Sequence, residues 1–218
     1  MPMQVTRRAL MLGLAGIVLS VAACRKASIR ATAVPAGASV LALGDSLTHG
    51  SGAAPESSYP AALQQLTGWP VVNAGVPGDT ASQALARLPD LLQQHAPKLV
   101  LVSIGGNDLL RRLPEGALRA DLRRICELSL AAGAQVLLVA VPRPSAAAVF
   151  IGSLTDHTLY AQLAEELGLP LQRQGWADVL SDERLRSDRI HANAEGYRQF
   201  AGQLAATARG VGLLAGAR

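Results

Sequence analysis

The chain is poor in aromatic residues, in cysteine and in unbalanced charge. Aromatic residues make up 3% of its 218 residues, and no basic stripe interleaved with aromatic residues occurs, which argues against a nucleic-acid surface. The formal net charge is +4, but Arg7 and Arg8 lie in a segment that we expect to be removed. Subtracting these two from the 20 basic residues leaves 18 against 16 acidic residues. This small excess predicts no polyanionic partner and no nucleic acid.

Metal chemistry also lacks its usual ligands. The two cysteines, Cys24 and Cys126, form no cluster, and the four histidines include no close pair. Asp45, Asp188 and His191 remain as conceivable ligands, but we predict no metal and no cofactor. Cys126 lies among apolar residues at helical spacing, which indicates a buried thiol and not a nucleophile.

Motifs for several other reactions are missing. No serine lies in a G-x-S-x-G elbow, and no phosphate-binding P-loop occurs. The stretch GSGAAP at residues 50–55 fails the dinucleotide-binding pattern at its last glycine. After the first apolar run, no second segment is long and apolar enough to span a membrane.

Residues 1–23 predict an export signal. Thr6-Arg7-Arg8 gives a positive start, and residues 9–23 form an apolar or small stretch that is shorter than the roughly 20 residues of a membrane-spanning helix. The paired arginines also resemble a twin-arginine signal. An ordinary signal peptide and an uncleaved anchor are the alternatives.

The end of this signal, VAAC at residues 21–24, resembles a bacterial lipobox. Cys24 is then the lipidated first residue of the mature protein, which we expect to be exported to the periplasm and anchored to the membrane by its lipid. Arg25 stands where Asp would favour the inner membrane, so the outer membrane is favoured. Residues 24–38 follow as lipidated cysteine and linker, and residues 39–212 as the folded domain.

Short apolar runs alternate with amphipathic helical patterns. Helical spacing recurs at residues 85–92, 118–128, 159–167 and 197–208, Pro60 suits the first turn of an earlier helix, and Pro89 is expected to kink or end its helix. This order predicts one α/β domain, a three-layer α/β/α sandwich around a parallel sheet. The predicted strands are residues 39–44, 70–75, 98–106 and 134–142, with a weaker one at 168–172.

Ligands of such a sheet bind at the carboxyl ends of its strands. Ser46 follows the first run, and its hydroxyl needs a base to become a nucleophile. His191 is the favoured base, because Asp188 lies three positions earlier and can orient its imidazole. Gly75 after the second run and Asn107 after the third can supply donors to an oxyanion.

The other three histidines are interpreted differently. His49 is close to Ser46 in sequence, but neighbours on a turn or helix start seldom face each other. His95 ends a helical pattern, and His157 lies in a loop-like stretch, so both are expected at the surface.

Four motifs resemble the SGNH subgroup of the GDSL hydrolase family. Residues 73–110 are especially similar to periplasmic bacterial thioesterase, arylesterase and lysophospholipase members. The motifs are GDSLTHG at residues 44–50, NAGVPGDT at 73–80, GGND at 105–108 and SDRIHANAEGY at 187–197.

The resemblance implies Ser46 as nucleophile, His191 as base and Asp188 as the acid that orients it. It also implies an oxyanion hole from the N–H of Ser46, the N–H of Gly75 and the side chain of Asn107. The implied fold is a five-stranded parallel sheet of flavodoxin-like order between helices.

Two departures from the family pattern stand out. Arg189 and Ala192 replace a glycine and a proline that members often carry near the histidine. Region 142–162, where relatives build part of the acyl pocket, is rich in alanine and does not indicate which length of acyl chain the enzyme prefers.

These expectations lead to a serine ester hydrolase that cleaves small-molecule or lipid acyl esters through an acyl-enzyme on Ser46, with thioesterase and lysophospholipase as the candidate activities. The first alternative is an O-acetylesterase that acts on cell-envelope glycans with the same residues. The second is a non-catalytic binding protein on a hydrolase scaffold.

Overall fold

The computed structural model describes residue 1 and residues 31–144 and 153–215. The predicted signal and Cys24 lie outside the described residues. Among the helices that are described, none is long and apolar enough to cross a membrane.

A five-stranded parallel sheet forms the centre of the domain, in the order β2-β1-β3-β4-β5. This result confirms the predicted α/β class and the flavodoxin-like order. β1, β2 and β3 end level with one another, since Gly44 lies opposite both Gly75 and Ser103. Polar residues that follow these strands therefore meet at one edge. The strands are Val40–Gly44, Val71–Gly75, Leu99–Ser103, Gln135–Val139 and Leu171–Gln172.

Helices cover both faces of the sheet. Along β1, Val40 and Ala42 face one hydrophobic core and Leu41 and Leu43 the other, because successive side chains of a strand alternate in direction. One face is covered by α3 (Ala81–His95), α5 (Glu115–Ala131) and α7 (Thr158–Leu167). The other is covered by α2 (Tyr59–Thr67), α8 (Gly175–Ser181) and α9 (Ala194–Val211).

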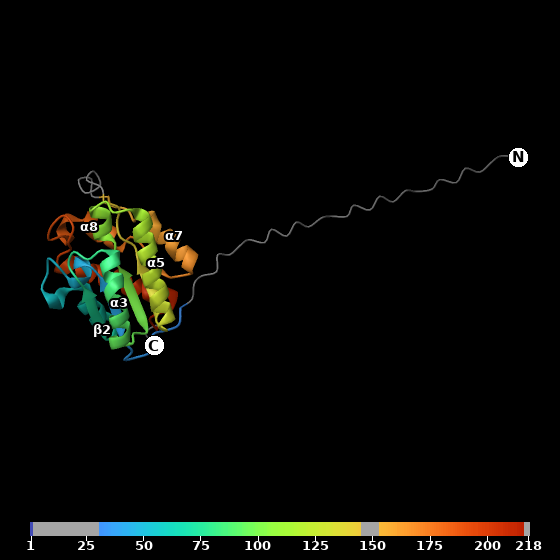
Figure 1. Ribbon diagram of the computed structural model, residues 1–218, viewed down its shortest axis with the longest axis horizontal. Helices are drawn as coiled ribbons and strands as arrows, with labels where there is room; N and C mark the ends of the chain where they lie inside the picture. The colour runs from blue at the N-terminus through green and yellow to red at the C-terminus, as the bar shows by residue number, and fades with distance from the viewer. Residues whose placement is uncertain (2–30, 145–152, 216–218) are drawn as a thin grey trace.

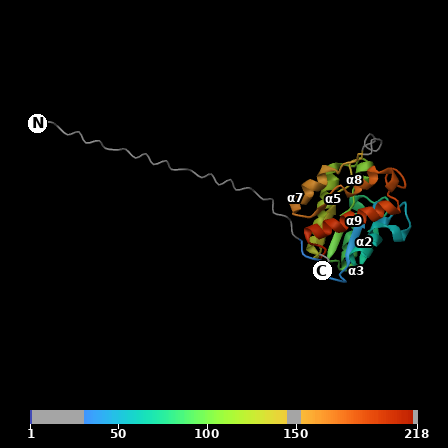
Figure 2. The ribbon, with the colours of Figure 1, turned by 180° about the vertical axis from the view of Figure 1, so that it is seen from behind.

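Figure 1 shows α3 and α5 in front of the sheet, and Figure 2, which views the molecule from the other side, shows α2 and α9 in front of it. Four short helical segments lie in the loops that the structure describes. They are α1 (Ser46–His49), η1 (Pro55–Ser57), α4 (Gly106–Leu110) and η2 (Glu183–Leu185).

Proline positions match the predictions only in part. Pro60 lies in the first turn of α2, as expected, where its missing N–H has no intrahelical acceptor. Pro89 lies inside α3, which continues to His95. Of the two expected effects of Pro89, a kink or an end of the helix, the second is therefore wrong.

The start of the domain also differs from the predicted boundary at residue 39. Ala31 and Val34 donate backbone hydrogen bonds to Val211 and Leu213 at 2.9 and 2.8 Å. Val34 is buried in the same core as α9. Residues 31–38, predicted as linker, thus pack against the domain, because an apolar residue in this stretch finds a place beside the last helix.

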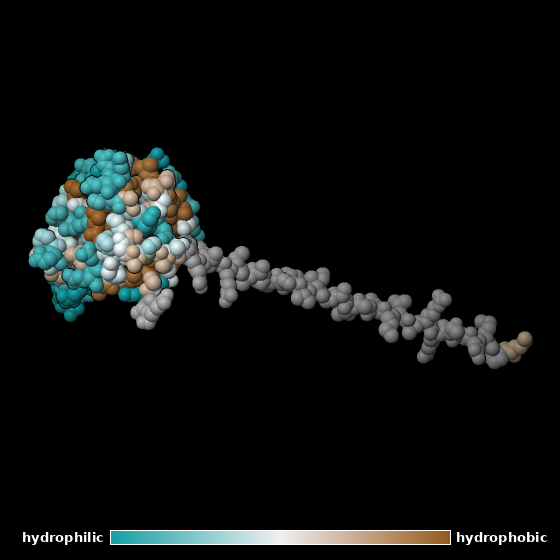
Figure 3. All heavy atoms as spheres, turned by 90° about the horizontal axis from the view of Figure 1, so that it is seen from below, coloured by the Kyte–Doolittle hydropathy of each residue, from teal (hydrophilic) through white to brown (hydrophobic). Residues whose placement is uncertain are grey.

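The strands begin at the opposite end of the domain. Seen from below, hydrophobic residues there are scattered among hydrophilic and intermediate ones (Figure 3).

Candidate active site

Ser46 begins α1 directly after β1. Asp45 caps this helix, and its Oδ1 accepts the Leu47 N–H at 3.0 Å. A Cβ on Gly44 would lie 2.4 Å from the carbonyl oxygen of Ser103, so this position has no space for a side chain. Gly50 ends α1 with a φ of 100°, which glycine adopts without strain. The two glycines of GDSLTHG therefore shape the turn that presents Ser46.

Ser46, His191 and Asp188 form a chain of hydrogen bonds. The Nε2 of His191 lies 3.0 Å from the Oγ of Ser46, although 145 positions separate the two residues. The Nδ1 of His191 lies 2.7 Å from the Oδ2 of Asp188. This arrangement allows His191 to take the serine proton while Asp188 fixes the tautomer and stabilises the resulting cation.

Hydrogen bonds stabilise the ionised form of the Asp188 carboxylate. Its Oδ1 accepts the N–H groups of Ile190 and His191, both at 2.8 Å. Burial opposes the charge, but the hydrogen bonds from the His191 side chain and from these two N–H groups outweigh it, so the pKa of Asp188 is lowered. Asp188 is accordingly an anion at neutral pH.

The loop that carries His191 is closed by its own backbone. Arg186 and Ala192 form an isolated antiparallel bridge, and the Ser187 N–H donates to the His191 carbonyl oxygen at 3.0 Å. The buried side chains of Leu185 and Ala192 fix this loop to the core beneath α9. The imidazole is thus held with its side chain 19% exposed, which leaves it accessible to substrate.

Two of the predicted oxyanion donors are available. Within the described chain, the N–H of Ser46 has no acceptor. The Nδ2 of Asn107 donates to the Asp79 carbonyl oxygen at 2.9 Å, which uses one of its two hydrogens and fixes the amide. The second hydrogen remains for a ligand.

The third predicted donor, Gly75, is already engaged. Its N–H donates to the Oδ1 of Asn73 at 3.0 Å. A Cβ at Gly75 would lie 2.1 Å from the backbone nitrogen of His49, so this glycine allows α1 to pack closely on β2. The structure gives Gly75 a packing role, and its N–H is not free for an oxyanion.

Gly78, which sequence reasoning missed, is better placed than Gly75. It immediately precedes Asp79, the residue to which Asn107 bonds, and its N–H has no acceptor among the residues described. Its carbonyl oxygen accepts Nη2 of Arg111 at 2.9 Å, and its φ is +84°. The signal in the sequence was the second glycine of NAGVPGDT.

Charged side chains hold this loop beside the sheet. Arg87 donates from Nε to the carboxylate of Asp79 at 2.8 Å and from Nη2 to the Gly44 carbonyl oxygen at 2.9 Å. The Oδ2 of Asp108 accepts the Ala81 N–H, at the start of α3, at 2.9 Å. One arginine and two carboxylates therefore link the end of β1, the loop after β2 and the Asn107 loop.

Comparison with known proteins agrees with this geometry. The sequence model of the GDSL-like Lipase/Acylhydrolase family matches residues 42–199. The chain belongs to this family. It is therefore a serine hydrolase that acts on ester bonds.

Relatives within the family include named enzymes. The thioesterase 1/protease 1/lysophospholipase L1 of Escherichia coli (strain K12) is 37% identical over 161 residues, covering 72% of this chain and 76% of that protein. An arylesterase of Vibrio mimicus is 32% identical over 165 residues, covering 72% and 80% of the two chains. The crystal structure of TesA superposes with a TM-score of 0.70 at 26% identity, covering 79% of this chain and 99% of that one.

An apolar cavity of about 450 Å³ adjoins the site. Leu47, Gly106 and Ile190 contribute to its wall, and each directly adjoins a candidate site residue in sequence: Ser46, Asn107 or His191. The remaining apolar lining comes mainly from Leu110, Val141, Leu154 and Leu180. Such a cavity can receive an acyl chain next to the serine.

The other histidines lie apart from this chemistry. His49 is exposed at the end of α1, where it makes no bond to Ser46. His95 is in the last turn of α3 and only partly exposed.

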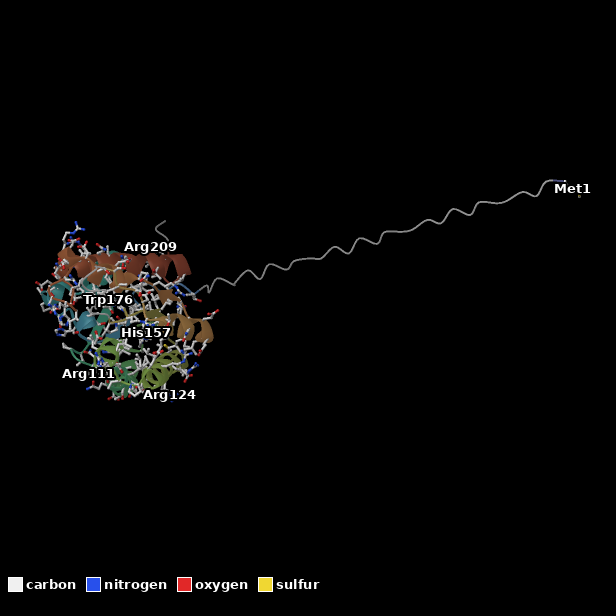
Figure 4. All side chains as sticks on the ribbon, turned by 90° about the horizontal axis from the view of Figure 1, so that it is seen from above. Met1, Arg111, Arg124, His157, Trp176 and Arg209 are labelled. Atoms are coloured by element: carbon white, nitrogen blue, oxygen red, sulfur yellow. The ribbon has the colours of Figure 1, made fainter. Side chains whose placement is uncertain are left out.

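The prediction that His157 lies at the surface is wrong. It is 7% exposed, and its Nδ1 caps α7 by accepting the Leu159 N–H. Burial lowers its pKa. Figure 4 places His157 and Trp176 within the domain, and Arg111, Arg124 and Arg209 at its edge. The role of His157 is structural, because its imidazole accepts the N–H that a side-chain oxygen usually accepts at the start of a helix.

Cys126 is fully buried, as predicted. Burial raises the pKa of its thiol to about 12, so it stays protonated and inert. Across residues 31–144 and 153–215, no group of three or more His, Cys, Asp or Glu residues is arranged to hold a metal ion.

Proposed function

We propose that Ser46 is the nucleophile of this hydrolase, with His191 as its base and Asp188 as the acid that orients the base. The hydrogen-bond chain through these three side chains, at 3.0 and 2.7 Å, carries the proposal. Ser46 attacks the ester carbonyl as His191 accepts the hydroxyl proton. His191 then gives this proton to the leaving alcohol or thiol, and water releases the acyl group by the same route.

We propose a corrected oxyanion hole for the tetrahedral intermediates. The N–H of Ser46 and the side chain of Asn107 stay in it as predicted, and the N–H of Gly78 replaces that of Gly75. This choice is supported by the free N–H of Gly78 and by the bond that ties Gly75 to Asn73. Donors held in advance stabilise the developing charge without reorganisation.

The substrates proposed are acyl esters or thioesters whose acyl chain enters the apolar cavity. A volume of about 450 Å³ is far more than an acetyl group needs, which favours longer acyl groups over O-acetylated glycans. The names of the matched relatives, a thioesterase/lysophospholipase and an arylesterase, support the same class.

Replacing Ser46 with Ala tests the nucleophile. The variant should lose about four orders of magnitude or more in kcat on 4-nitrophenyl butyrate, since removing one member of such a triad removes the covalent route. A fluorophosphonate probe should label the wild type at Ser46 and leave the variant unlabelled. Equal turnover by both proteins, or labelling at another residue, would exclude this mechanism.

For the location of the enzyme, we propose export and lipidation at Cys24, with the domain held at the periplasmic side of the outer membrane. The positive start, the apolar stretch and VAAC at residues 21–24 support this proposal. Mass spectrometry of the mature N-terminus should find a diacylated or triacylated cysteine. A mature protein that starts elsewhere would contradict lipidation.

A further inference from the structure

Arg186 lies in the wall of the apolar cavity, next to the loop that carries His191. Its side chain is 9% exposed, which is unusual for arginine. Its Nη2 donates to the Oε1 of Glu183 at 2.9 Å. Its Nη1 is buried and has no hydrogen-bond partner in the part of the chain that the structure describes.

A buried guanidinium keeps its charge, and each N–H that it leaves unpaired is costly. Glu183 balances only part of this charge, because its own side chain is 86% exposed and largely hydrated. The nearby carboxylate of Asp188 is already engaged by His191. The structure therefore holds a cationic donor in the cavity wall without a full set of acceptors.

Basic side chains outnumber acidic ones among the described residues that line the cavity. Arg143 and Arg189 also line the cavity, and Glu183 is the acidic residue among the lining residues described. Arg184, two positions before Arg186, differs from it: its side chain is 88% exposed and pairs with Asp182. The side chain of Arg186 thus lies in the cavity wall, whereas that of Arg184 lies on the protein surface.

We propose that Arg186 is a specificity residue that binds an anionic group, a carboxylate or a phosphate, on the ester substrate. The inference rests on the proposed function, because it places this anion in the cavity that receives the substrate of Ser46. A planar guanidinium can bind such a group with two parallel hydrogen bonds. The guanidinium of Arg186 supplies the donors to the anion, and Arg143 and Arg189 add attraction at the cavity wall.

Three esters with the same acyl length test the proposal and locate the anion. The neutral ester is 4-nitrophenyl hexanoate. Mono-4-nitrophenyl adipate carries a carboxylate at the far end of the acyl chain, and 3-carboxy-4-nitrophenyl hexanoate carries one on the leaving group. We expect wild type to prefer one anionic ester, and Arg186→Gln to lower kcat/KM for that ester by roughly tenfold or more.

The neutral ester should lose much less, and Arg186→Lys should restore part of the preference. Arg184→Gln is the matched control, and it should leave all three rates as in the wild type. An equal loss on all three esters in Arg186→Gln would show a purely structural role and overturn the proposal. So would unchanged rates on both anionic esters.

A binding measurement separates this inference from the proposed function. Adipate and hexyl phosphate are titrated calorimetrically into Ser46→Ala and into the double variant Ser46→Ala, Arg186→Gln. Tighter binding of either anion by the single variant supports the site even if no ester is hydrolysed. If neither anion binds the single variant more tightly, the site is refuted, whatever the fate of the esterase mechanism.

Discussion

One face of the sheet is packed with aromatic side chains, and the other is packed mainly with aliphatic ones. The chain has seven aromatic residues, and Tyr59, Trp176, Tyr197 and Phe200 form a single cluster on the first face. The rings of Trp176 and Phe200 stack with their centroids 3.6 Å apart. On the second face, leucine, isoleucine, valine and alanine fill most of the core around α3, α5 and α7, together with the ring of Tyr160.

The two faces support different halves of the site, which we call the base half (Asp188 and His191) and the donor half (Gly78 and Asn107). Leu185 and Ala192, on either side of the Asp188 and His191 segment, pack into the aromatic face, and Tyr197 ties the same region to the turn after α1 by donating to the Ser51 carbonyl oxygen at 2.6 Å. The donor half lies towards the aliphatic face and is held mainly by Arg87 and by Asp108, as described above.

This difference has a physical origin. Aromatic rings combine a large apolar area with a polar edge, so one residue can pack in the core and also hold a loop by a hydrogen bond. Aliphatic side chains have no such edge, and the donor half depends mainly on charged groups that bond to the backbone, with Tyr160 donating in addition to the Ile104 carbonyl oxygen at 2.8 Å. The comparison predicts that the two halves respond differently to substitution.

The largest expected effect is on the base half. His191→Gln should lower kcat/KM on 4-nitrophenyl butyrate by about four orders of magnitude, because His191 is the hydrogen-bond partner of the Ser46 Oγ among the described residues. Steady-state kinetics measures this loss, and thermal unfolding should stay near the wild-type midpoint. The matched control, exposed His49→Gln, should keep its activity, and a comparable loss there would contradict the assignment of the base.

A smaller effect is expected from the donor half. Asn107→Ala should lower kcat by roughly a hundredfold with little change in KM, since the amide acts on the developing oxyanion. The Asp79 carbonyl oxygen also loses its donor, so unfolding in urea should reveal some destabilisation. If KM rises while kcat stays constant, Asn107 binds the ground state and is no oxyanion donor.

The smallest effect concerns Asp45, at the junction of the two halves. Burial raises its pKa to about 6, whereas the unfolded chain should titrate near the reference value of 3.8. Between about pH 4 and pH 6 the folded state therefore holds a proton that the unfolded state has lost. The free energy of unfolding decreases over this range as the pH rises, because ionising Asp45 is harder in the folded state.

Asp45→Asn should remove this dependence and still accept the Leu47 N–H. The free energy of unfolding of the variant minus that of the wild type should be larger at pH 8 than at pH 4, by about 2 to 3 kcal/mol. Urea unfolding at the two pH values measures this double difference, in which the other titrating groups are common to both proteins. An equal difference at both pH values would show that Asp45 is not the responsible group.

The sequence predicted the fold because its signals are local and repeated. Apolar runs gave the strands to within a few residues, and helical spacing gave α3, α5, α7 and α9. Those parts of the site that depend on residues close together in the chain could also be predicted from the sequence. Asp188 lies three residues before His191, so the short bond between them follows from a single turn of the chain.

The failures have tertiary causes. The choice between Gly75 and Gly78 depends on which N–H is left free, and the side chain of Asn73 decides that by bonding to Gly75. His157 follows a loop-like pattern in sequence, yet it is buried because α7 begins beneath it. Both outcomes depend on neighbours that the spacing of residues does not reveal.

By itself, the sequence determined the layered α/β architecture, the glycine-bounded turn at Ser46 and the Asp188–His191 pair, because each depends on residues that are near in the chain. Only the tertiary structure decided that His191 meets Ser46 across 145 positions, that Gly75 is engaged and Gly78 is not, and that Arg186 is buried beside an apolar cavity. Parallel strands that end at one level bring distant loops together, and packing then determines which polar atoms remain without partners.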